Sequence, residues 1–239
     1  NIYGTIEHVV GDITKGFAEA DVIVERMYTT HRAHQIYFEP HTCLVAVDSD
    51  GVAQVWFASG TPGLNRDEIA RALELPVASV VVNFSLLGGS YGGKTDGTEV
   101  ILCYLLAKRT GRPVKYIADQ TEEFAAMHPR NPSEIRIKAG VKLDGTLTAW
   151  EADLYFMTGA YAGYTLVPSA GGISPSSVTG AYKTPNVAIR SHQIYANTVP
   201  CGYMRGPGPF QCGFACESHI DVIAAEGGLN PAEMRRRNL

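Results

Sequence analysis

The 239-residue sequence lacks the features that mark several large classes of protein. It has no excess of positive charge: 20 lysines and arginines stand against 24 aspartates and glutamates, for a net charge of -4. This balance argues against a protein that binds nucleic acid by neutralising phosphates. Its apolar runs fall far short of the roughly 20 residues that cross a bilayer, so we expect no membrane partner. It has no repeat and no low-complexity tract, and 45% hydrophobic residues indicate a globular protein.

The sequence also lacks a residue pattern that would predict a metal-binding site or a disulfide bond. Its five cysteines include no C-x-x-C pair, which fits reduced thiols, and no apolar leader precedes the first strand, so we expect a cytoplasmic protein. His31, His34 and His41 look like spaced metal ligands. In an extended segment, however, residues three apart point to opposite faces, and we expect His31 and His34 to diverge.

The spacing of apolar residues predicts a mixture of strands and helices. Strands are expected over residues 21–30, 44–48, 52–57, 77–86, 113–118, 135–143, 146–156 and 187–198. Helices are expected over residues 66–74, 100–109 and 210–225, with a short last helix after residue 230. Asp-Gly steps at 50–51 and 144–145 predict two hairpin turns, and residues 159–182 predict a long ordered loop. We therefore predict an α+β fold of mixed sheets with packed helices, in two parts, 1–125 and 126–239, with a seam near residues 120–132.

A glycine-rich loop is the most specific motif. Gly88–Thr95 reads Gly-Gly-Ser-Tyr-Gly-Gly-Lys-Thr and satisfies the P-loop pattern G-x-x-x-x-G-K-[ST] in full. Such a loop converges backbone N–H groups on an anionic or oxo ligand. A second glycine loop, Arg205–Gln211, precedes another predicted helix, and two such loops predict a ligand held from two sides. The first loop follows more than eighty residues that contain hairpins, which argues against a nucleoside triphosphatase; an NTP-binding module remains the alternative.

Both loops resemble those of the molybdenum hydroxylases, the family of xanthine dehydrogenase and aldehyde oxidase. Gly88–Lys94 is similar to the family's G-G-G-F-G-G-K loop, with Ser90 for the third glycine and Tyr91 for phenylalanine. Tyr203–Gln211 is similar to its F-R-G-F-G-x-P-Q loop, and His34–Pro40 to its H-x-x-Y-x-E-P strand. The resemblance runs in the same order along nearly the whole chain. It implies the molybdopterin-binding domain of this family.

The resemblance also implies where the cofactor lies. A molybdopterin, in its cytosine dinucleotide form, is expected between the loops, held by the backbone at Tyr91 and Gly92 and backed by Arg205. No side chain of this chain is expected to bind the metal. Gly60 stands where the family often has a glutamine that donates a hydrogen bond to an oxo ligand.

Three further positions bear on the substrate, by the same resemblance. Thr95 follows the loop lysine where purine-hydroxylating members have glutamate, and Pro207 replaces a phenylalanine that walls the substrate ring. Arg136 matches an arginine that those members direct at substrate, although a charge on the face of a hairpin explains it equally well. These differences disfavour xanthine and leave N-heteroaromatic compounds and aldehydes as substrates.

Family molybdenum subunits are much longer than this chain, and their general-base glutamate lies in a distal portion. No catalytic residue is therefore expected here. Relatives such as nicotinate dehydrogenase divide the molybdenum part between two chains, and Leu239 lies about where that division falls. The implied partners are a second molybdenum-subunit portion, a subunit with iron–sulfur clusters and a flavin subunit with FAD. An inactive family member is the third possibility, given Gly60 and the missing base.

Overall fold

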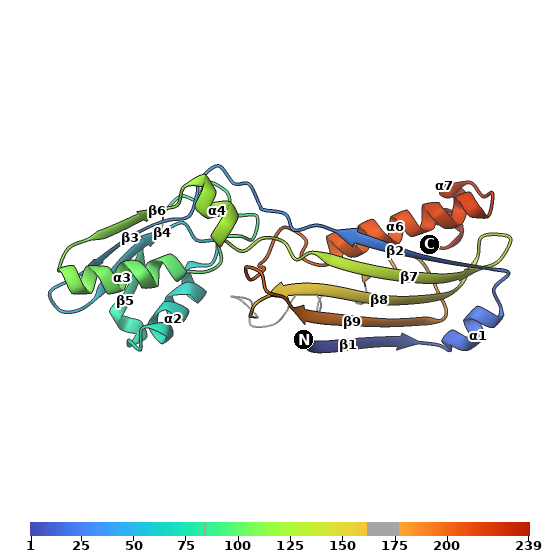
Figure 1. Cartoon of the computed structure of the whole chain (residues 1–239), viewed down its shortest axis with the longest axis horizontal. Helices are drawn as coiled ribbons and strands as arrows, with labels where there is room; N and C mark the ends of the chain where they lie inside the picture. The colour runs from blue at the N-terminus through green and yellow to red at the C-terminus, as the bar shows by residue number, and fades with distance from the viewer. Residues whose placement is uncertain (84, 162–176) are drawn as a thin grey trace. The chain divides into compact units, whose positions relative to one another are not determined.

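The computed structural model describes residues 1–83, 85–161 and 177–239 and groups the chain into two compact units (Figure 1). The five-stranded unit comprises Asn1–Ala33, Arg130–Cys201 and Gly206–Leu239, and the four-stranded unit comprises His34–Pro129 and Gly202–Arg205. Both units are thus discontinuous in sequence, whereas the expected parts 1–125 and 126–239 are continuous. The chain re-enters the five-stranded unit at Arg130, within the expected seam at residues 120–132.

The sheet of the five-stranded unit has the order β1-β9-β8-β7-β2. Its strands are β1 (Ile2–Val10), β2 (Val22–Thr30), β7 (Ser133–Val141), β8 (Leu147–Gly159) and β9 (Val187–Tyr195). Neighbouring strands are antiparallel except for the parallel pair β8 and β9. The predicted hairpin joins β7 to β8, and Gly145 supplies the positive φ of +89° that its turn requires.

Among the described residues of this unit there are three helices, α1 (Ile13–Ala18), α6 (Pro209–Glu226) and α7 (Pro231–Arg237). Helix α6 lies along β2 and β7, as Figure 1 shows, and buries Ile220 and Ile223 in the core. Trp150 of β8 is fully buried in the same cluster. The short last helix begins as its sequence predicts, because the Asn230 side chain accepts hydrogen bonds from the amides of Ala232 and Glu233.

The sheet of the four-stranded unit has the order β5-β4-β3-β6. Its strands are β3 (Thr42–Val47), β4 (Ala53–Phe57), β5 (Val80–Asn83) and β6 (Val114–Ile117), and only the pair β4 and β5 is parallel. Its helices are α2 (Pro62–Ala72), α3 (Thr98–Thr110) and α4 (Gln120–Ala126), with a 3₁₀ turn η1 (Val77–Ser79) before β5. Val45, Val55, Val100 and Tyr104 meet in the core between the sheet and its helices.

The predicted α+β class, with mixed sheets and packed helices, is confirmed. Most of the loop expected over residues 159–182 lies outside the described residues. Within the described ranges, every helix is too short or too polar to traverse a lipid bilayer.

Candidate functional site

The Gly88–Lys94 loop lies in the four-stranded unit, between β5 and α3. Gly89 and Gly92 both have φ +97°, and Tyr91 has φ +49°. Glycine adopts this left-handed backbone at little cost, whereas a residue such as tyrosine carries strain of about 1–3 kcal/mol. Strain of this kind persists only where surrounding contacts hold the backbone in place.

Within this loop, backbone carbonyl groups accept hydrogen bonds from the chain, whereas most of the backbone amides at its tip donate none to its described residues. Ser90 O accepts a hydrogen bond from Gly93 N at 2.8 Å, and Tyr91 O accepts one from Arg205 N at 2.8 Å. Across the residues that the structure describes, the amides of residues 89–92 donate to no group of the chain. Successive amides with left-handed residues among them form a concave set of donors that suits anionic or oxo ligands.

The residues Gly202–Arg205, which belong to the same unit and lead into the second glycine loop, meet the first loop at Tyr91, where the Arg205 amide donates its hydrogen bond. At Gly92 there is no room for a side chain, because a Cβ there would lie 3.0 Å from both the Cβ and the carbonyl oxygen of Tyr203. Gln35 holds Tyr203 in place, since its Nε2 donates a hydrogen bond to Tyr203 O at 2.7 Å. The structure thus brings the predicted residues Tyr91, Gly92 and Arg205 into one place.

Gly60 and Thr95 lie at the same loop. Gly60 N donates to Lys94 O at 2.9 Å, and a Cβ on Gly60 would lie 3.6 Å from both Lys94 O and Ser90 Oγ. Thr95 Oγ1 donates to Gly92 O at 3.4 Å. Five of the seven predicted site residues therefore gather within the four-stranded unit.

The other two predicted residues, Arg136 and Pro207, belong to the five-stranded unit. Arg136 lies on β7, where its Nε donates to Glu25 Oε1 at 2.7 Å and its Nη1 lies 3.9 Å from Asp153 Oδ2. The hydrogen bond to Glu25 raises the pKa of Arg136 further. The guanidinium is thus already paired on the sheet face. Pro207 lies between two glycines with positive φ, directly before α6.

The remainder of the second loop is fixed within the five-stranded unit. Arg130 Nη1 donates to Gln211 Oε1 at 3.0 Å and to Gly206 O at 3.2 Å. The same Gln211 oxygen accepts a hydrogen bond from Gly208 N, the N-cap residue of α6, at 3.1 Å. The turn from Gly206 into α6 is therefore held by two buried side chains.

Lys94 differs from the lysine of a nucleotide-binding P-loop. Its side chain is fully buried, and Nζ donates to Glu39 Oε2 at 2.8 Å while lying 4.6 Å from the centre of the Tyr37 ring. Burial raises the pKa of Glu39, but the hydrogen bonds from Lys94 and the Gly88 amide, together with the charge of Lys94, outweigh burial, and the pKa lies below its ordinary value. A P-loop lysine must reach the phosphates of a nucleotide, and this one is already occupied.

The surroundings of the loop also depart from the P-loop arrangement. β5 ends at Asn83, and α3 begins at Thr98 with Gly97 as its N-cap, so the Gly-Lys-Thr step does not open the helix. Only one pair of strands in this sheet is parallel. The P-loop match of Gly88–Thr95 is therefore one of sequence alone, and the structure gives no support to the NTP-binding alternative.

A buried cluster lies in the same unit around Glu123 of α4. Glu123 accepts hydrogen bonds from the backbone and ring of His41 and, at 2.9 Å, from Tyr37 Oη. His34 Nε2 lies 3.6 Å from the same carboxylate. Burial lowers the pKa of His41, but the hydrogen bond to Glu123 and the surrounding negative charges of Glu99, Glu123 and Asp96 together outweigh it, and the pKa is raised. Burial raises the pKa of Glu123, and His41 outweighs that effect, so this pKa is lowered.

Two further acids lie near this cluster, at the start of α3. Asp96 Oδ2 lies 3.0 Å from His128 Nε2. Burial raises the pKa of Asp96, but His128, the Thr98 amide and the charge of His41 together outweigh burial, so this pKa is lowered. For Glu99, burial dominates and the nearby charge of Asp96 adds to it, so the pKa is raised to about 7. Searching the described part of the chain gives no cluster of side chains that could hold a metal ion.

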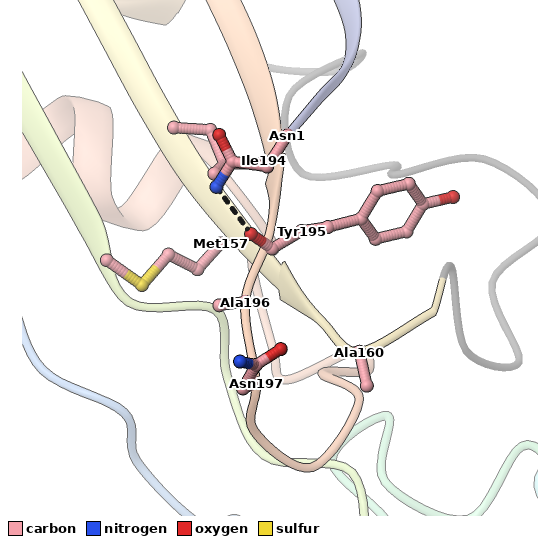
Figure 2. A pocket seen from close by; sticks show the side chains of 7 residues that line it. All are labelled: Asn1, Met157, Ala160, Ile194, Tyr195, Ala196 and Asn197. Carbon is pink, nitrogen blue, oxygen red and sulfur yellow. Dashed lines mark hydrogen bonds between the residues drawn. The ribbon is translucent and has the colours of Figure 1, made fainter.

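An open pocket of about 410 Å³ lies in the five-stranded unit, at the ends of β8 and β9. Its lining residues are Asn1, Met157, Ala160, Ile194, Tyr195, Ala196 and Asn197 (Figure 2). Asn1 Nδ2 donates to Tyr195 O at 2.8 Å, and the ring of Tyr195 points away from that bond in Figure 2. This lining contains no carboxylate, histidine or cysteine, so the pocket offers less chemistry than the glycine loops.

Sequence reasoning missed the residues that hold the loops, namely Gln35, Tyr37, Glu39 and Glu123. The first three fall at alternate positions of the His34–Pro40 motif, and this spacing was the available signal, although the segment is bent and Ile36 has φ +51°. The sequence gives no comparable signal for Glu123.

Comparison with known proteins supports the resemblance of the loops. The model of a family described as "Molybdopterin cofactor-binding domain" matches residues 1–239. The chain is 30% identical over its whole length to the nicotinate dehydrogenase large molybdopterin subunit of Eubacterium barkeri, covering 56% of that protein. It is 32% identical over 95% of its length to the xanthine dehydrogenase molybdenum-binding subunit of Escherichia coli O157:H7, covering 30% of that protein.

Solved structures agree. The whole chain superposes on quinoline 2-oxidoreductase from Pseudomonas putida 86 with a TM-score of 0.94 at 25% identity, covering 31% of that chain. It superposes on the aldehyde oxidoreductase of Desulfovibrio gigas with a TM-score of 0.90 at 28% identity, covering 26%. The chain therefore spans between about a quarter and just over half of these relatives.

Proposed function

We propose a function from the premise that this chain belongs to the family of molybdopterin cofactor-binding domains. In this proposal it forms part of a molybdenum-dependent hydroxylase or dehydrogenase and holds one side of the cofactor. The relatives that it matches are themselves named as dehydrogenases and oxidoreductases. Because the chain spans only part of them, activity requires further protein, and the general base comes from that portion.

The free amides of residues 89–92 carry the proposal. Within the described residues they donate no hydrogen bond to the chain itself, while the carbonyls at Ser90 and Tyr91 are already used. Oxygen-rich groups of molybdenum and its pterin match such a set of donors. A side chain at Gly92 would collide with Tyr203, so the loop lets a ligand approach its backbone closely. The residues present therefore fit the cofactor.

Roles for single residues follow. Tyr91 and Gly92 would present backbone to the cofactor, and Arg205 would back it from the second loop. Gly60 would leave space where a glutamine stands in other family members. Thr95 would face the substrate from the first loop and Pro207 from the turn before α6, whereas the Arg136 guanidinium is paired with Glu25 on the sheet face. The bound cofactor supplies the redox chemistry, whereas these residues orient it and exclude water.

The proposed cofactor is the cytosine dinucleotide form of molybdopterin, with iron–sulfur clusters and FAD on partner chains. The proposed partners are a second molybdenum-subunit portion, an iron–sulfur subunit and a flavin subunit, in the cytoplasm. The substrate is an N-heteroaromatic compound or an aldehyde. Relatives named for nicotinate and quinoline favour the heteroaromatic class.

Metal and nucleotide analysis of the native complex tests this function. We expect molybdenum and pterin in equal amounts, with CMP released on acid hydrolysis. A complex that contains neither molybdenum nor pterin would contradict the proposal. A loaded complex that reduces no dye with any heteroaromatic compound or aldehyde would instead identify an inactive family member.

Gly60→Gln probes the oxo side of the site. A Cβ at Gly60 makes only ordinary contacts of 3.6 Å, so the variant should fold, with its unfolding midpoint moved by no more than about 4 °C. We expect unchanged molybdenum content and an altered rate of reduction by substrate. Gly63→Gln is the matched control, because a Cβ there meets nothing within 4 Å. Equal reduction rates in both variants and the parent would contradict this placement of Gly60.

A further inference from the structure

The segment before β3 contacts the glycine loop through alternate residues. The backbone here is not a regular strand, since Ile36 has φ +51° and residues 38–39 form a bend. A Cβ on Gly93 would lie 2.8 Å from the Gln35 amide carbon and 3.0 Å from the Tyr37 ring. A Cβ on Gly88 would lie 2.6 Å from the Glu39 Cβ. The loop is thus packed closely against three alternate side chains of this segment.

Glu39 joins the two ends of the loop. Its Oε2 accepts hydrogen bonds from Gly88 N at 2.9 Å and from Lys94 Nζ at 2.8 Å. Charge-assisted hydrogen bonds of this kind are about twice as strong as neutral ones. The first and last residues of the loop are therefore held to one carboxylate oxygen, while its tip keeps its amides free.

Gln35 joins the second loop to the same segment. Its Nε2 donates to Tyr203 O at 2.7 Å and to His128 O at 2.8 Å, and both acceptors are backbone oxygens. Tyr203 in turn packs against Gly92, and Arg205 donates to Tyr91. The amide group of Gln35 is buried, so these bonds are shielded from water.

We propose that Glu39 and Gln35 are positioning residues that set the free amides of residues 89–92 and Arg205 at the spacing that one ligand requires. Glu39 sets the curvature of the first loop, and Gln35 sets the distance of Tyr203 and Arg205 from it. This inference rests on the proposed function, because the ligand is the molybdenum cofactor. Neither side chain needs to touch the cofactor in order to act.

The test uses the native complex with Glu39→Gln, Gln35→Met and the double variant Glu39→Gln/Lys94→Met. Each single variant should lower the molybdenum content about tenfold, since Glu39→Gln leaves the buried Lys94 charge without its counter-ion, and Gln35→Met leaves the Tyr203 and His128 carbonyls without their donor. The molybdenum(V) paramagnetic resonance spectrum of the fraction still loaded should shift or broaden. The double variant leaves no unpaired buried charge, yet it cannot join the loop ends, so its molybdenum content should stay low.

Gln54→Met is the matched control, because Gln54 is a half-buried glutamine of the same unit whose partners are Asp48 and Asn83. It should keep both molybdenum content and spectrum. Full recovery of molybdenum content in the double variant would overturn the positioning role of Glu39, because it would show that only the charge balance between Glu39 and Lys94 affects molybdenum content. If a Glu39 variant fails to assemble, Gln35→Met decides alone, because it introduces no unpaired charge.

The outcomes separate the two proposals. A parent complex without molybdenum would contradict the proposed function itself. A loaded parent whose Glu39→Gln and Gln35→Met variants have parental content and spectra would overturn the positioning role and leave the proposed function standing.

Discussion

Replacing Gly92 by valine is expected to empty the complex of molybdenum. Gly92 has φ +97°, where a β-branched residue is strained, and its Cβ would lie 3.0 Å from the carbonyl oxygen of Tyr203. That oxygen is backbone and is held by Gln35, so it cannot yield easily. Backbone strain alone costs about 1–3 kcal/mol, and displacement of Tyr203 would separate the two loops. Molybdenum content per complex is the measurement.

Gly51→Val is the control for this prediction. Gly51 has φ +87° in the turn between β3 and β4, and a Cβ there meets nothing within 4 Å. The variant therefore carries similar strain without the collision. We expect a lower unfolding temperature with parental molybdenum content. Equal molybdenum content in Gly92→Val and Gly51→Val would count against the assignment of the loop.

Replacing Glu123 by glutamine is expected to destabilise the four-stranded unit by about 3 kcal/mol. The carboxylate is buried and accepts hydrogen bonds from His41 and from Tyr37 Oη. A glutamine of the same size brings an NH₂ group against these donors and leaves His41 without its counter-ion. Because Tyr37 also packs against the glycine loop, the loss should extend to the site.

Hydrogen exchange measured by mass spectrometry locates this effect. In Glu123→Gln, peptides from α4 and β3 should lose protection, while peptides from β7 and β8 should keep theirs. Glu122→Gln is the matched control one residue away, since Glu122 is exposed and its Oε2 accepts hydrogen bonds only near the surface, from the Asp119 amide that opens α4 and from Tyr116 Oη. That variant should change stability by less than about 0.5 kcal/mol. Similar exchange in both variants would refute the role of the buried carboxylate.

The pH dependence of the Glu123 effect follows from two pKa shifts of opposite sign. The pKa of Glu123 is lowered from 4.5, so its contribution to stability is complete above that value and is lost as the pH falls through the lowered pKa. The pKa of His41 is raised from 6.5, so its contribution is complete below that value and is lost as the pH rises through the raised pKa.

The difference in thermal midpoint between the parent and Glu123→Gln should therefore be largest between pH 4.5 and 6.5. His34 contributes in the same sense, because burial lowers its pKa and the Glu123 carboxylate, 3.6 Å away, opposes that lowering only in the parent. Thermal denaturation at a series of pH values measures this difference. A difference that grows steadily towards alkaline pH would contradict the paired arrangement.

Local signals in the sequence predicted much of the fold. Both hairpins follow from Asp-Gly turns between alternating strands, and the last helix follows from its asparagine cap and first-turn proline. β1 was missed because both of its faces are largely exposed, so its residues do not alternate in the usual way. α4 was missed because seven residues are too few to establish a helical period.

The candidate site also has a part that the sequence predicted and a part that it did not. The two loops could be predicted because glycines and their neighbours form a family pattern. The hydrogen bonds that hold these loops could not be predicted, because they join residues far apart in sequence. The separation is 82 residues between His41 and Glu123 and 168 residues between Gln35 and Tyr203. Spacing along a chain says little about such pairs, since they depend on how two elements pack.

Anomalous diffraction at the molybdenum absorption edge, from crystals of the native complex, tests the central claim most directly. We predict one molybdenum peak beside the Tyr91–Gly92 backbone, with Arg205 on the other side of the cofactor. A peak remote from both loops, or no peak in a catalytically active complex, would contradict the account.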